Sequence, residues 1–269
     1  MNESLKLMCI MAHPDDETLG VGSTLAKYAD EGIEVYLVTA TRGERGWFGT
    51  REDFPGKEAL GRIREAELRC AAQTLGIKQV EFLDYIDGDL DKADPTEAIG
   101  KIVESIRRVR PDVVITFPPD GAYGHPDHIA ICQFTTAALV SAADPTYPVK
   151  NQLQPHRVSK LYYTADNQEL FEIYTQIFGD LRMTIDGKER QAVAWSDWAI
   201  TTHIDGEKYW PSTWQAVQCH ASQIAGLGDR ERITEEQHRR LWSERTYYRA
   251  YSLVNGGRKI ETDLFAGLR

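Results

Sequence analysis

Hydrophobic residues fall into short runs that alternate with longer amphipathic stretches through the first half of the chain. Runs of about four to eight apolar residues, many of them β-branched, are typical of buried strands, and apolar residues at every third or fourth position are typical of helices. Four segments of each kind alternate, with strands expected at 5–12, 33–40, 79–84 and 112–117 and helices at 17–32, 58–76, 94–110 and 126–142. This alternation predicts a parallel sheet with helices on both faces.

The pattern is less regular after about residue 144. We expect further strands at 160–165, 199–205 and 246–254, a β-hairpin at 181–195 around the turn-like sequence IDGK, and helices at 210–224 and 234–244. No repeat, low-complexity tract or linker marks a second unit in the sequence. We therefore predict an α/β protein with one domain over 1–269 and a Rossmann-like, mostly parallel sheet. In this prediction 1–143 form the doubly wound core, and 144–269 complete the sheet and the substrate pocket.

Net charge, apolar segments and cysteines indicate which classes of partner this protein lacks and where in the cell it is expected. The 269-residue chain has a net charge of −10, which argues against nonspecific binding to nucleic acid or to an anionic membrane. No segment approaches the roughly 18 to 20 apolar residues of a membrane helix, and the first strand is too short for a secretory signal, so we expect a cytoplasmic protein. The four cysteines are far apart without a C-x-x-C pair, and we expect buried free thiols at Cys9, Cys70, Cys132 and Cys219.

Two loops contain dense clusters of histidine and aspartate. An open parallel sheet binds its ligand beyond the carboxyl ends of its strands, where the strand order reverses. If the order is the common 3-2-1-4-5, that crevice lies between the first and fourth strands. The loops that leave these strands are AHPDDE (12–17) and FPPDGAYGHPDHI (117–129), and no other loop has such a cluster. The topology and the composition therefore point to the same place.

The residue types in these loops indicate a metal site. His13 and Asp16 are three residues apart, and His128 comes from the opposing loop. Two imidazoles and one carboxylate form a frequent catalytic zinc set that leaves one position open, although the same set also suits iron(II) and cobalt. A dication would also offset the repulsion among the clustered carboxylates. We expect one Zn²⁺ per chain.

The remaining side chains of the two loops suit the catalysis of hydrolysis. Asp15 cannot easily share the metal with its neighbour Asp16, so it is free to act as general base on a metal-activated water. His125 is a candidate acid and a stabiliser of a developing oxyanion. Asp127 either orients His125 or only begins the following helix. Together these groups predict metal-assisted hydrolysis of a carbonyl bond.

Both loops resemble the motifs of the PIG-L/LmbE-type zinc-dependent N-deacetylases. Weaker matches to the same family are TRGERG (41–46), the pair Arg64 and Glu67, Asp87-Gly88, HASQ (220–223) and ETDLFAGL (261–268). The resemblance implies removal of acetyl from an N-acetylglucosamine-containing small molecule, with the metal ligands, base and oxyanion partner named above. It also implies a sugar contact by Arg64 and a homo-oligomer, either a trimer or a hexamer.

Other residues of the candidate site have two interpretations. Tyr123 borders the substrate pocket or packs within its loop, and Glu44 contacts the site or is a solvated acid. Glu17 is expected to stabilise the start of a helix. His220 and Gln223 share one helical face and are expected either to flank the crevice or, in the case of His220, to be an ordinary surface histidine. Specificity is expected to depend on the segments 41–56, 84–94 and 144–200, which one sequence does not decode.

Two alternatives to a deacetylase stay open. The same active site would serve an amidase that cleaves a larger N-acyl group, such as that of a thiol conjugate, because the acyl pocket is set by loops outside the motifs. A non-catalytic metal-binding module is the second alternative. It is disfavoured because a metal trap needs neither Asp15 nor His125. Nucleotide binding at Gly20-Val21-Gly22 is also disfavoured, since the preceding acids would repel a pyrophosphate.

Overall fold

A seven-stranded sheet forms the centre of the computed structural model, which describes residues 4–180, 182–185, 187–224 and 233–269. Its strand order is β3-β2-β1-β4-β5-β9-β8. The first five strands are parallel, and β9 runs antiparallel to both β5 and β8. The strands are β1 (Lys6–Met11), β2 (Glu34–Thr41), β3 (Gln79–Tyr85), β4 (Val113–Thr116), β5 (Lys160–Thr164), β8 (Thr202–Asp205) and β9 (Glu244–Ser252).

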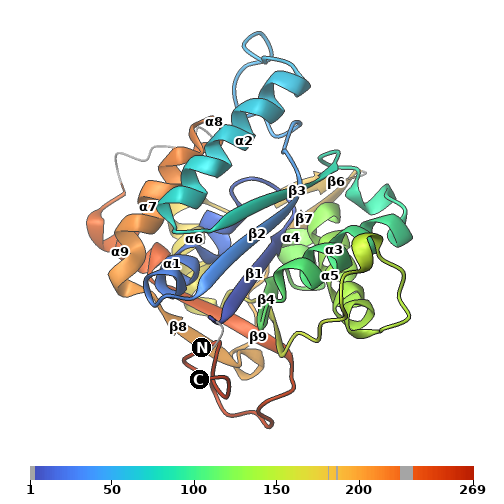
Figure 1. Ribbon diagram of the computed structural model, residues 1–269. Coiled ribbons are helices and arrows are strands. Elements are labelled where there is room, and N and C mark those ends of the chain that lie inside the picture. The colour runs from blue at the N-terminus through green and yellow to red at the C-terminus, as the bar shows by residue number, and fades with distance from the viewer. Residues whose placement is uncertain (1–3, 181, 186, 225–232) are drawn as a thin grey trace.

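Helices cover both faces of this sheet (Figure 1). The helices α1 (Asp16–Asp30), α2 (Lys57–Thr74) and α7 (Trp210–Cys219) pack together on one face, and α3 (Pro95–Val109) and α5 (Pro126–Ala143) pack together on the other. Because both faces are covered, the residues of β4 and nearly all of those of β1 are buried. The two central strands therefore read as continuous apolar runs in the sequence.

The predicted fold class is confirmed. The core has the expected strand order 3-2-1-4-5, and the expected hairpin is β6 (Arg182–Ile185) with β7 (Lys188–Gln191), although residues 181 and 186 of the predicted range lie outside the described residues. The predicted helix 210–224 is divided at His220 into α7 and α8 (Ala221–Ile224). The remaining short elements are α4 (Gly121–Gly124), α9 (Glu235–Trp242) and the 3-10 turns Leu90–Lys92, Lys150–Gln152, Asp197–Ala199 and Glu207–Tyr209.

One helix, α6 (Gln168–Phe178), was not expected from the sequence. Its signals are local: the side chain of Asn167 caps the helix by accepting from the Leu170 N–H at 2.9 Å, and Gly179 follows its last residue. Only Leu170 and Ile173 are buried, which gives a narrow apolar stripe. Such a stripe is a weak signal among the irregular segments after residue 144.

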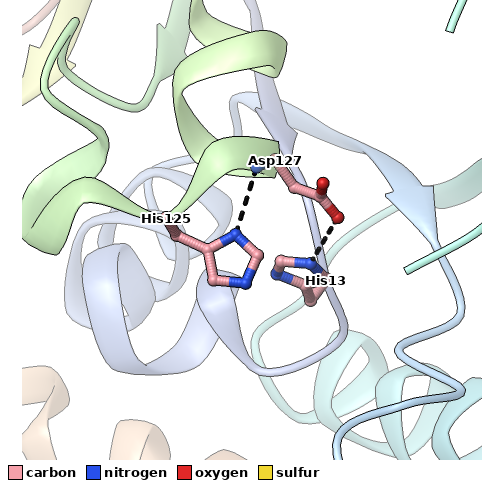
Figure 2. Close-up of side chains that lie close together, drawn as sticks. All are labelled: His13, His125 and Asp127. Carbon is pink, nitrogen blue, oxygen red and sulfur yellow. Dashed lines mark hydrogen bonds and ion pairs between the residues drawn. The ribbon is translucent and has the colours of Figure 1, made fainter. Parts of the chain in front are cut away.

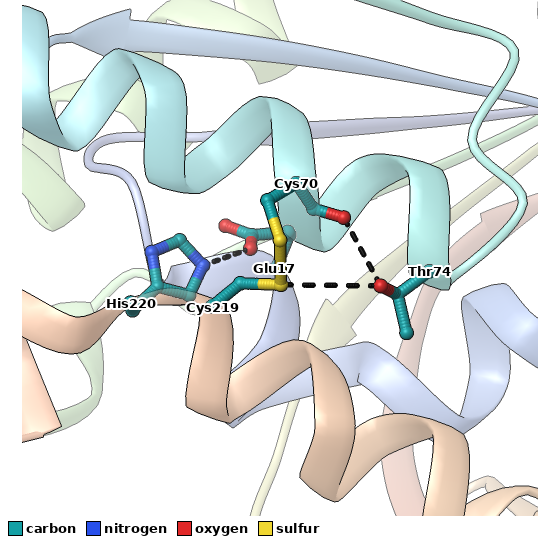
Figure 3. Close-up of a disulfide and its surroundings, with 5 residues drawn as sticks. All are labelled: Glu17, Cys70, Thr74, Cys219 and His220. Carbon is teal, nitrogen blue, oxygen red and sulfur yellow. Dashed lines mark hydrogen bonds and ion pairs between the residues drawn. A yellow bond between two sulfur atoms is a disulfide. The ribbon is translucent and has the colours of Figure 1, made fainter.

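The prediction of four free thiols is wrong for two of them. Cys70 in α2 and Cys219 at the end of α7 form a disulfide, with their Cα atoms 5.8 Å apart (Figure 3). Cys9 and Cys132 are buried free thiols, as predicted. The pairing joins residues 149 positions apart, and only the packing of α2 against α7 brings them together. Cysteine spacing therefore contained no signal for the disulfide.

The C-terminal segment is fixed to the sheet by a buried ion pair. Glu261 accepts from Lys160 Nζ at 2.7 Å and from the Tyr162 hydroxyl at 2.6 Å, and Arg249 lies 2.8 Å from the same carboxylate. Lys160 is fully buried. The ETDLFAGL segment is thus bound to β5 and β9 through the carboxylate of Glu261.

None of the helices in the described ranges combines the length and the apolar character that a membrane span requires.

Candidate active site

The two histidine- and aspartate-rich loops meet at one edge of the sheet. β1 and β4 are parallel neighbours, so the loops that follow them leave the sheet side by side. The first loop leads into α1, and the second passes through α4 into α5. The structure brings together five of the predicted site residues from these loops, namely His13, Asp16, His125, Asp127 and His128.

Three side chains present donor atoms at the spacing of a metal site. His13 Nδ1 lies 3.2 Å from His128 Nε2 and 3.6 Å from Asp16 Oδ2. Asp16 Oδ1 lies 3.5 Å from His128 Nε2. Bonds of about 2.0–2.1 Å in a tetrahedral zinc site place the donor atoms roughly 3.3 Å apart. The donor set therefore fits a small divalent cation in both chemistry and spacing.

The other ring nitrogen of His13 faces two carboxylates. His13 Nε2 lies 3.1 Å from Asp127 Oδ2 and 3.2 Å from Asp87 Oδ1 (Figure 2 shows the first contact). Burial alone would lower the pKa of His13, yet the three carboxylates around its ring raise it well above its ordinary value. In the neutral form of the ring these two carboxylates favour the proton on Nε2, which leaves the Nδ1 lone pair to face His128 and Asp16. Carboxylates that orient a metal-binding imidazole in this way are typical of metal centres.

Asp127 occupies a different place from the one we expected. Its carboxylate contacts His13, and only its backbone N–H reaches His125, donating to Nδ1 at 3.1 Å (Figure 2). The carboxylate also accepts from Gly88 N at 2.7 Å and Leu90 N at 3.1 Å. These contacts occupy its oxygens, so a second conceivable metal group of His13, His125 and Asp127 is less suitable than the first. Asp127 therefore supports His13.

Hydrogen bonds also set the orientation of the other two histidines. His128 Nδ1 lies 3.3 Å from the Gly121 carbonyl, so Nδ1 carries the proton and Nε2 is free to bind a metal. Burial lowers the pKa of His128 to about 3, which keeps its imidazole neutral. Because His125 Nδ1 accepts from the backbone, its neutral form carries the proton on Nε2. Burial lowers the pKa of His125 as well, although that side chain is only half-buried.

Asp15 is held in an unusual conformation beside Arg64. Its φ of 108° lies in the left-handed region, and its side chain makes no capping hydrogen bond to the helix that it begins. Instead, Asp15 Oδ2 accepts from Arg64 Nη2 at 3.1 Å. Burial raises the pKa of Asp15 to about 6, against the lowering effect of Arg64. The carboxylate is thus partly desolvated and not bound to its own helix.

The three residues expected to contact substrate lie around this centre. Arg64 is buried and donates to the carbonyls of Pro14 and Gly43 as well as to Asp15. Glu44 Oε1 accepts from Asp87 N at 3.1 Å, and its Oε2 is buried without a partner among the described atoms. The Tyr123 ring lies edge-on to His128 at 5.2 Å.

A cavity of about 680 Å³ opens beside Glu44. It lies between the start of α2 and the segments that follow β2 and β3, and none of the donor residues lines it. Its wall is formed largely by charged side chains: Arg42, Glu44, Arg45, Lys57, Glu58, Arg62, Asp84 and Asp89. The expected specificity segments 41–56 and 84–94 therefore both contribute to the cavity beside Glu44.

Two acidic residues, Asp87 and Glu17, make buried contacts that the sequence did not predict. Asp87 received only a weak motif match, yet it contacts His13 and accepts from Arg45 N at 3.0 Å. Its signal was the Asp-Gly pair directly after the third strand. Glu17 was interpreted as a helix-start residue, but its buried carboxylate also contacts His220 Nε2 at 2.7 Å. A pairing across 203 residues leaves no local signal.

Comparison with known proteins identifies the family. Residues 8–139, which include both loops, match the PIG-L family, described as GlcNAc-PI de-N-acetylase. A 1D-myo-inositol 2-acetamido-2-deoxy-alpha-D-glucopyranoside deacetylase of Streptomyces avermitilis is 34% identical, and the alignment covers 98% of this chain and 97% of that protein. The chain belongs to the PIG-L family. Its relatives are named as deacetylases, so this PIG-L protein is an enzyme of the N-deacetylase class.

Two further proteins are similar to the chain but have names that describe other reactions. A mycothiol S-conjugate amidase of Streptomyces coelicolor is 32% identical to this PIG-L protein over 100% of the chain and 99% of the amidase. The crystal structure of GalB, the 4-carboxy-2-hydroxymuconate hydratase of Pseudomonas putida, superposes with a TM-score of 0.70 at 19% identity and covers 94% of this chain and 99% of GalB. The second similarity shows the fold alone.

Proposed function

We propose that this protein is a zinc-dependent hydrolase that removes the acetyl group from an N-acetylglucosamine-type conjugate. The observation that carries the proposal is the set of donor atoms on His13, Asp16 and His128, with the His125 ring 4.8 Å from that of His13 and with Asp15 next to Asp16 in the same loop. A structural cluster of this kind would need neither a desolvated carboxylate nor an imidazole with a free Nε2–H. The five side chains together match what hydrolysis of an amide requires.

The roles of the residues follow from their contacts. A zinc ion on the three donors would supply Lewis-acid activation of water and of the amide carbonyl. Asp15, with its pKa raised to about 6 by burial, accepts a proton from the attacking water. The His125 Nε2–H donates to the carbonyl oxygen as negative charge develops there. The water oxygen bonds to the carbonyl carbon, the carbon–nitrogen bond breaks, and the amine nitrogen takes the proton.

The supporting groups keep these atoms in place. Asp127 and Asp87 hold the His13 ring so that Nδ1 faces the metal position. Arg64 binds Asp15 and the preceding Pro14 carbonyl, which fixes the base. We propose that Glu44, whose free Oε2 needs a donor, and Tyr123 contact the hydroxyl-rich part of the substrate.

The cavity beside Glu44 offers space and hydrogen-bonding groups for the remainder of such a conjugate. Its charged side chains supply donors and acceptors for the hydroxyl groups of a polyol, and the carbon stems of the same side chains add apolar surface. The 34% identity to an inositol-conjugate deacetylase supports this substrate class. The 32% identity to a mycothiol S-conjugate amidase, across nearly all of that protein, favours a larger N-acyl group as the second candidate.

A direct assay separates the two candidates. The zinc-loaded protein would be incubated with the N-acetylglucosaminyl inositol named above and, separately, with a mycothiol S-conjugate. We expect acetate release from the first substrate and a much slower amide cleavage in the second. Faster cleavage of the thiol conjugate would favour the amidase, and a metal-replete protein inactive on both would contradict the proposal.

A further inference from the structure

The conformation of Asp15 requires support from outside its own loop. A non-glycine residue in the left-handed region costs on the order of 1–3 kcal/mol and persists only where its surroundings fix it. Asp15 has a φ of 108° and a ψ of −27°. Its carbonyl accepts from the N–H groups of Thr18 and Leu19, both at 3.0 Å. These helix contacts hold its carbonyl, and its N–H needs a separate partner.

Glu17 binds that N–H. The Asp15 N–H donates to Glu17 Oε2 at 3.0 Å, and the other oxygen of the same carboxylate lies 2.7 Å from His220 Nε2. Glu17 is 1% exposed and His220 is 2% exposed. A buried carboxylate needs a partner, because burying an isolated charge is costly. The contact with His220 therefore stabilises the buried carboxylate of Glu17.

His220 is itself fixed by contacts to the helix that carries Arg64. The adjacent Cys219 is bonded to Cys70 of α2, and Figure 3 shows His220 and Glu17 next to this disulfide. Ser222 donates to Glu67 of α2 through both its N–H and its hydroxyl, each at 2.7 Å. Both supports of Asp15, the Arg64 guanidinium and the Glu17–His220 pair, are thus built on α2 and the helices joined to it.

We propose that Glu17 and His220 are positioning residues that hold the backbone of Asp15 so that its carboxylate faces the reacting water. Neither residue touches the substrate. They act through the Asp15 N–H, whereas Arg64 acts on the carboxylate and on the preceding carbonyl. The inference rests on the proposed function, in which Asp15 is the base. It gives the motif's third acid a task beyond starting α1.

Kinetics of four variants test the pair. Glu17→Ala and His220→Ala should each lower kcat by about 10- to 100-fold, the usual cost of losing a supporting partner in a metal site. KM and zinc content should stay at wild-type values, because the metal ligands and the pocket are unchanged. His220→Gln, whose amide can donate to Glu17, should recover most of the loss. The double variant Glu17→Ala/His220→Ala should be no slower than Glu17→Ala, since the two residues act through one contact.

His238→Ala is the matched control. His238 is also buried, lies on α9 and accepts from Trp242 Nε1 at 3.2 Å, away from the candidate site. It should lower the melting temperature and leave kcat unchanged. Wild-type kcat in folded, zinc-loaded Glu17→Ala and His220→Ala would overturn the proposal. Loss of zinc in these variants would also overturn it, because the pair would then support Asp16.

Hydrogen exchange of the zinc-loaded proteins gives a readout independent of turnover. In Glu17→Ala and His220→Ala, the amides of residues 15–19 should lose protection, whereas in His238→Ala they should keep it. If the wild type released no acetate, the proposed function would fail, and the exchange data alone would decide the inference. Unchanged protection in both alanine variants would overturn it. If these variants do not fold, Glu17→Met and His220→Leu, which fill the same space without making either hydrogen bond, serve for the same measurement, and His220→Gln should keep the protection.

Discussion

The Cys70–Cys219 disulfide is expected to be a main contributor to stability. It joins residues 149 positions apart in the sequence. In the chain-entropy treatment, a bond that closes a loop of this size costs the unfolded chain about 5 kcal/mol of conformational freedom at 25 °C. With an unfolding entropy of about 2.1 cal/mol/K per residue, this corresponds to a shift of roughly 9 °C in melting temperature. The variant Cys70→Ser/Cys219→Ser should therefore melt about 9 °C lower.

Calorimetry and a thiol titration check this expectation together. Under non-reducing conditions in denaturant, the wild type should show two reactive thiols, those of Cys9 and Cys132. A reducing agent should lower the melting temperature of the wild type to that of the double serine variant and leave the variant unchanged. Cys132→Ala, which alters a buried thiol without breaking a bond, should have a much smaller effect.

Two results would refute the reasoning about the disulfide. Four reactive thiols in the unreduced wild type would mean that the bond is not formed in the protein as isolated. A normal disulfide with no loss of melting temperature in the serine variant would mean that the unfolded chain is not restricted by the bond. The same titration bears on the predicted cytoplasmic location, because stable disulfides are rare in the cytosol.

Three further predictions follow from the site and its supports. His13→Ala or His128→Ala should abolish zinc binding, as measured by elemental analysis after dialysis. Asp127→Asn should weaken zinc affinity by about 10- to 100-fold, measured by competition with a chelator, because its carboxylate orients His13. Glu261→Gln should lower the free energy of unfolding by about 3–5 kcal/mol, because Lys160 would be left buried without its charged partner. Burial would raise the pKa of Glu261, but hydrogen bonds from Lys160 and neighbouring groups outweigh it and lower the pKa below its ordinary 4.5. The stabilisation by Glu261 is therefore complete above pH 4.5 and is lost as the pH falls through the lowered pKa. In urea titrations at pH 3 to 7, the free energy of unfolding of the wild type should fall toward low pH by an amount that Glu261→Gln lacks.

Local patterns were sufficient to predict the core and to predict that the two histidine- and aspartate-rich loops lie side by side. The run KLMCIM could be interpreted as a buried strand because helices cover both of its faces. Strand order then followed from the common topology of such sheets, and it placed AHPDDE opposite GHPDH. Both steps depend on residues close together in the sequence. The structure confirms the fold class and brings the two loops together.

Contacts between distant segments were beyond such reasoning. The Asp127 carboxylate contacts His13, and nothing in the order of residues distinguishes that contact from one to the nearby His125. The disulfide and the contact of Glu17 with His220 depend on how α7 packs against α2 and α1. That packing is the sum of many weak apolar contacts, which a single sequence does not order.

Turnover by Asp15→Ala tests the central claim most directly. The zinc-loaded wild type and variant would be compared for acetate release from the N-acetylglucosaminyl inositol, with zinc content measured on the same samples. We expect the variant to keep its zinc and to lose about 10²- to 10⁴-fold in kcat, the range for removal of a general base. A variant that retained both zinc and full activity would contradict the assignment of Asp15 and the mechanism built on it.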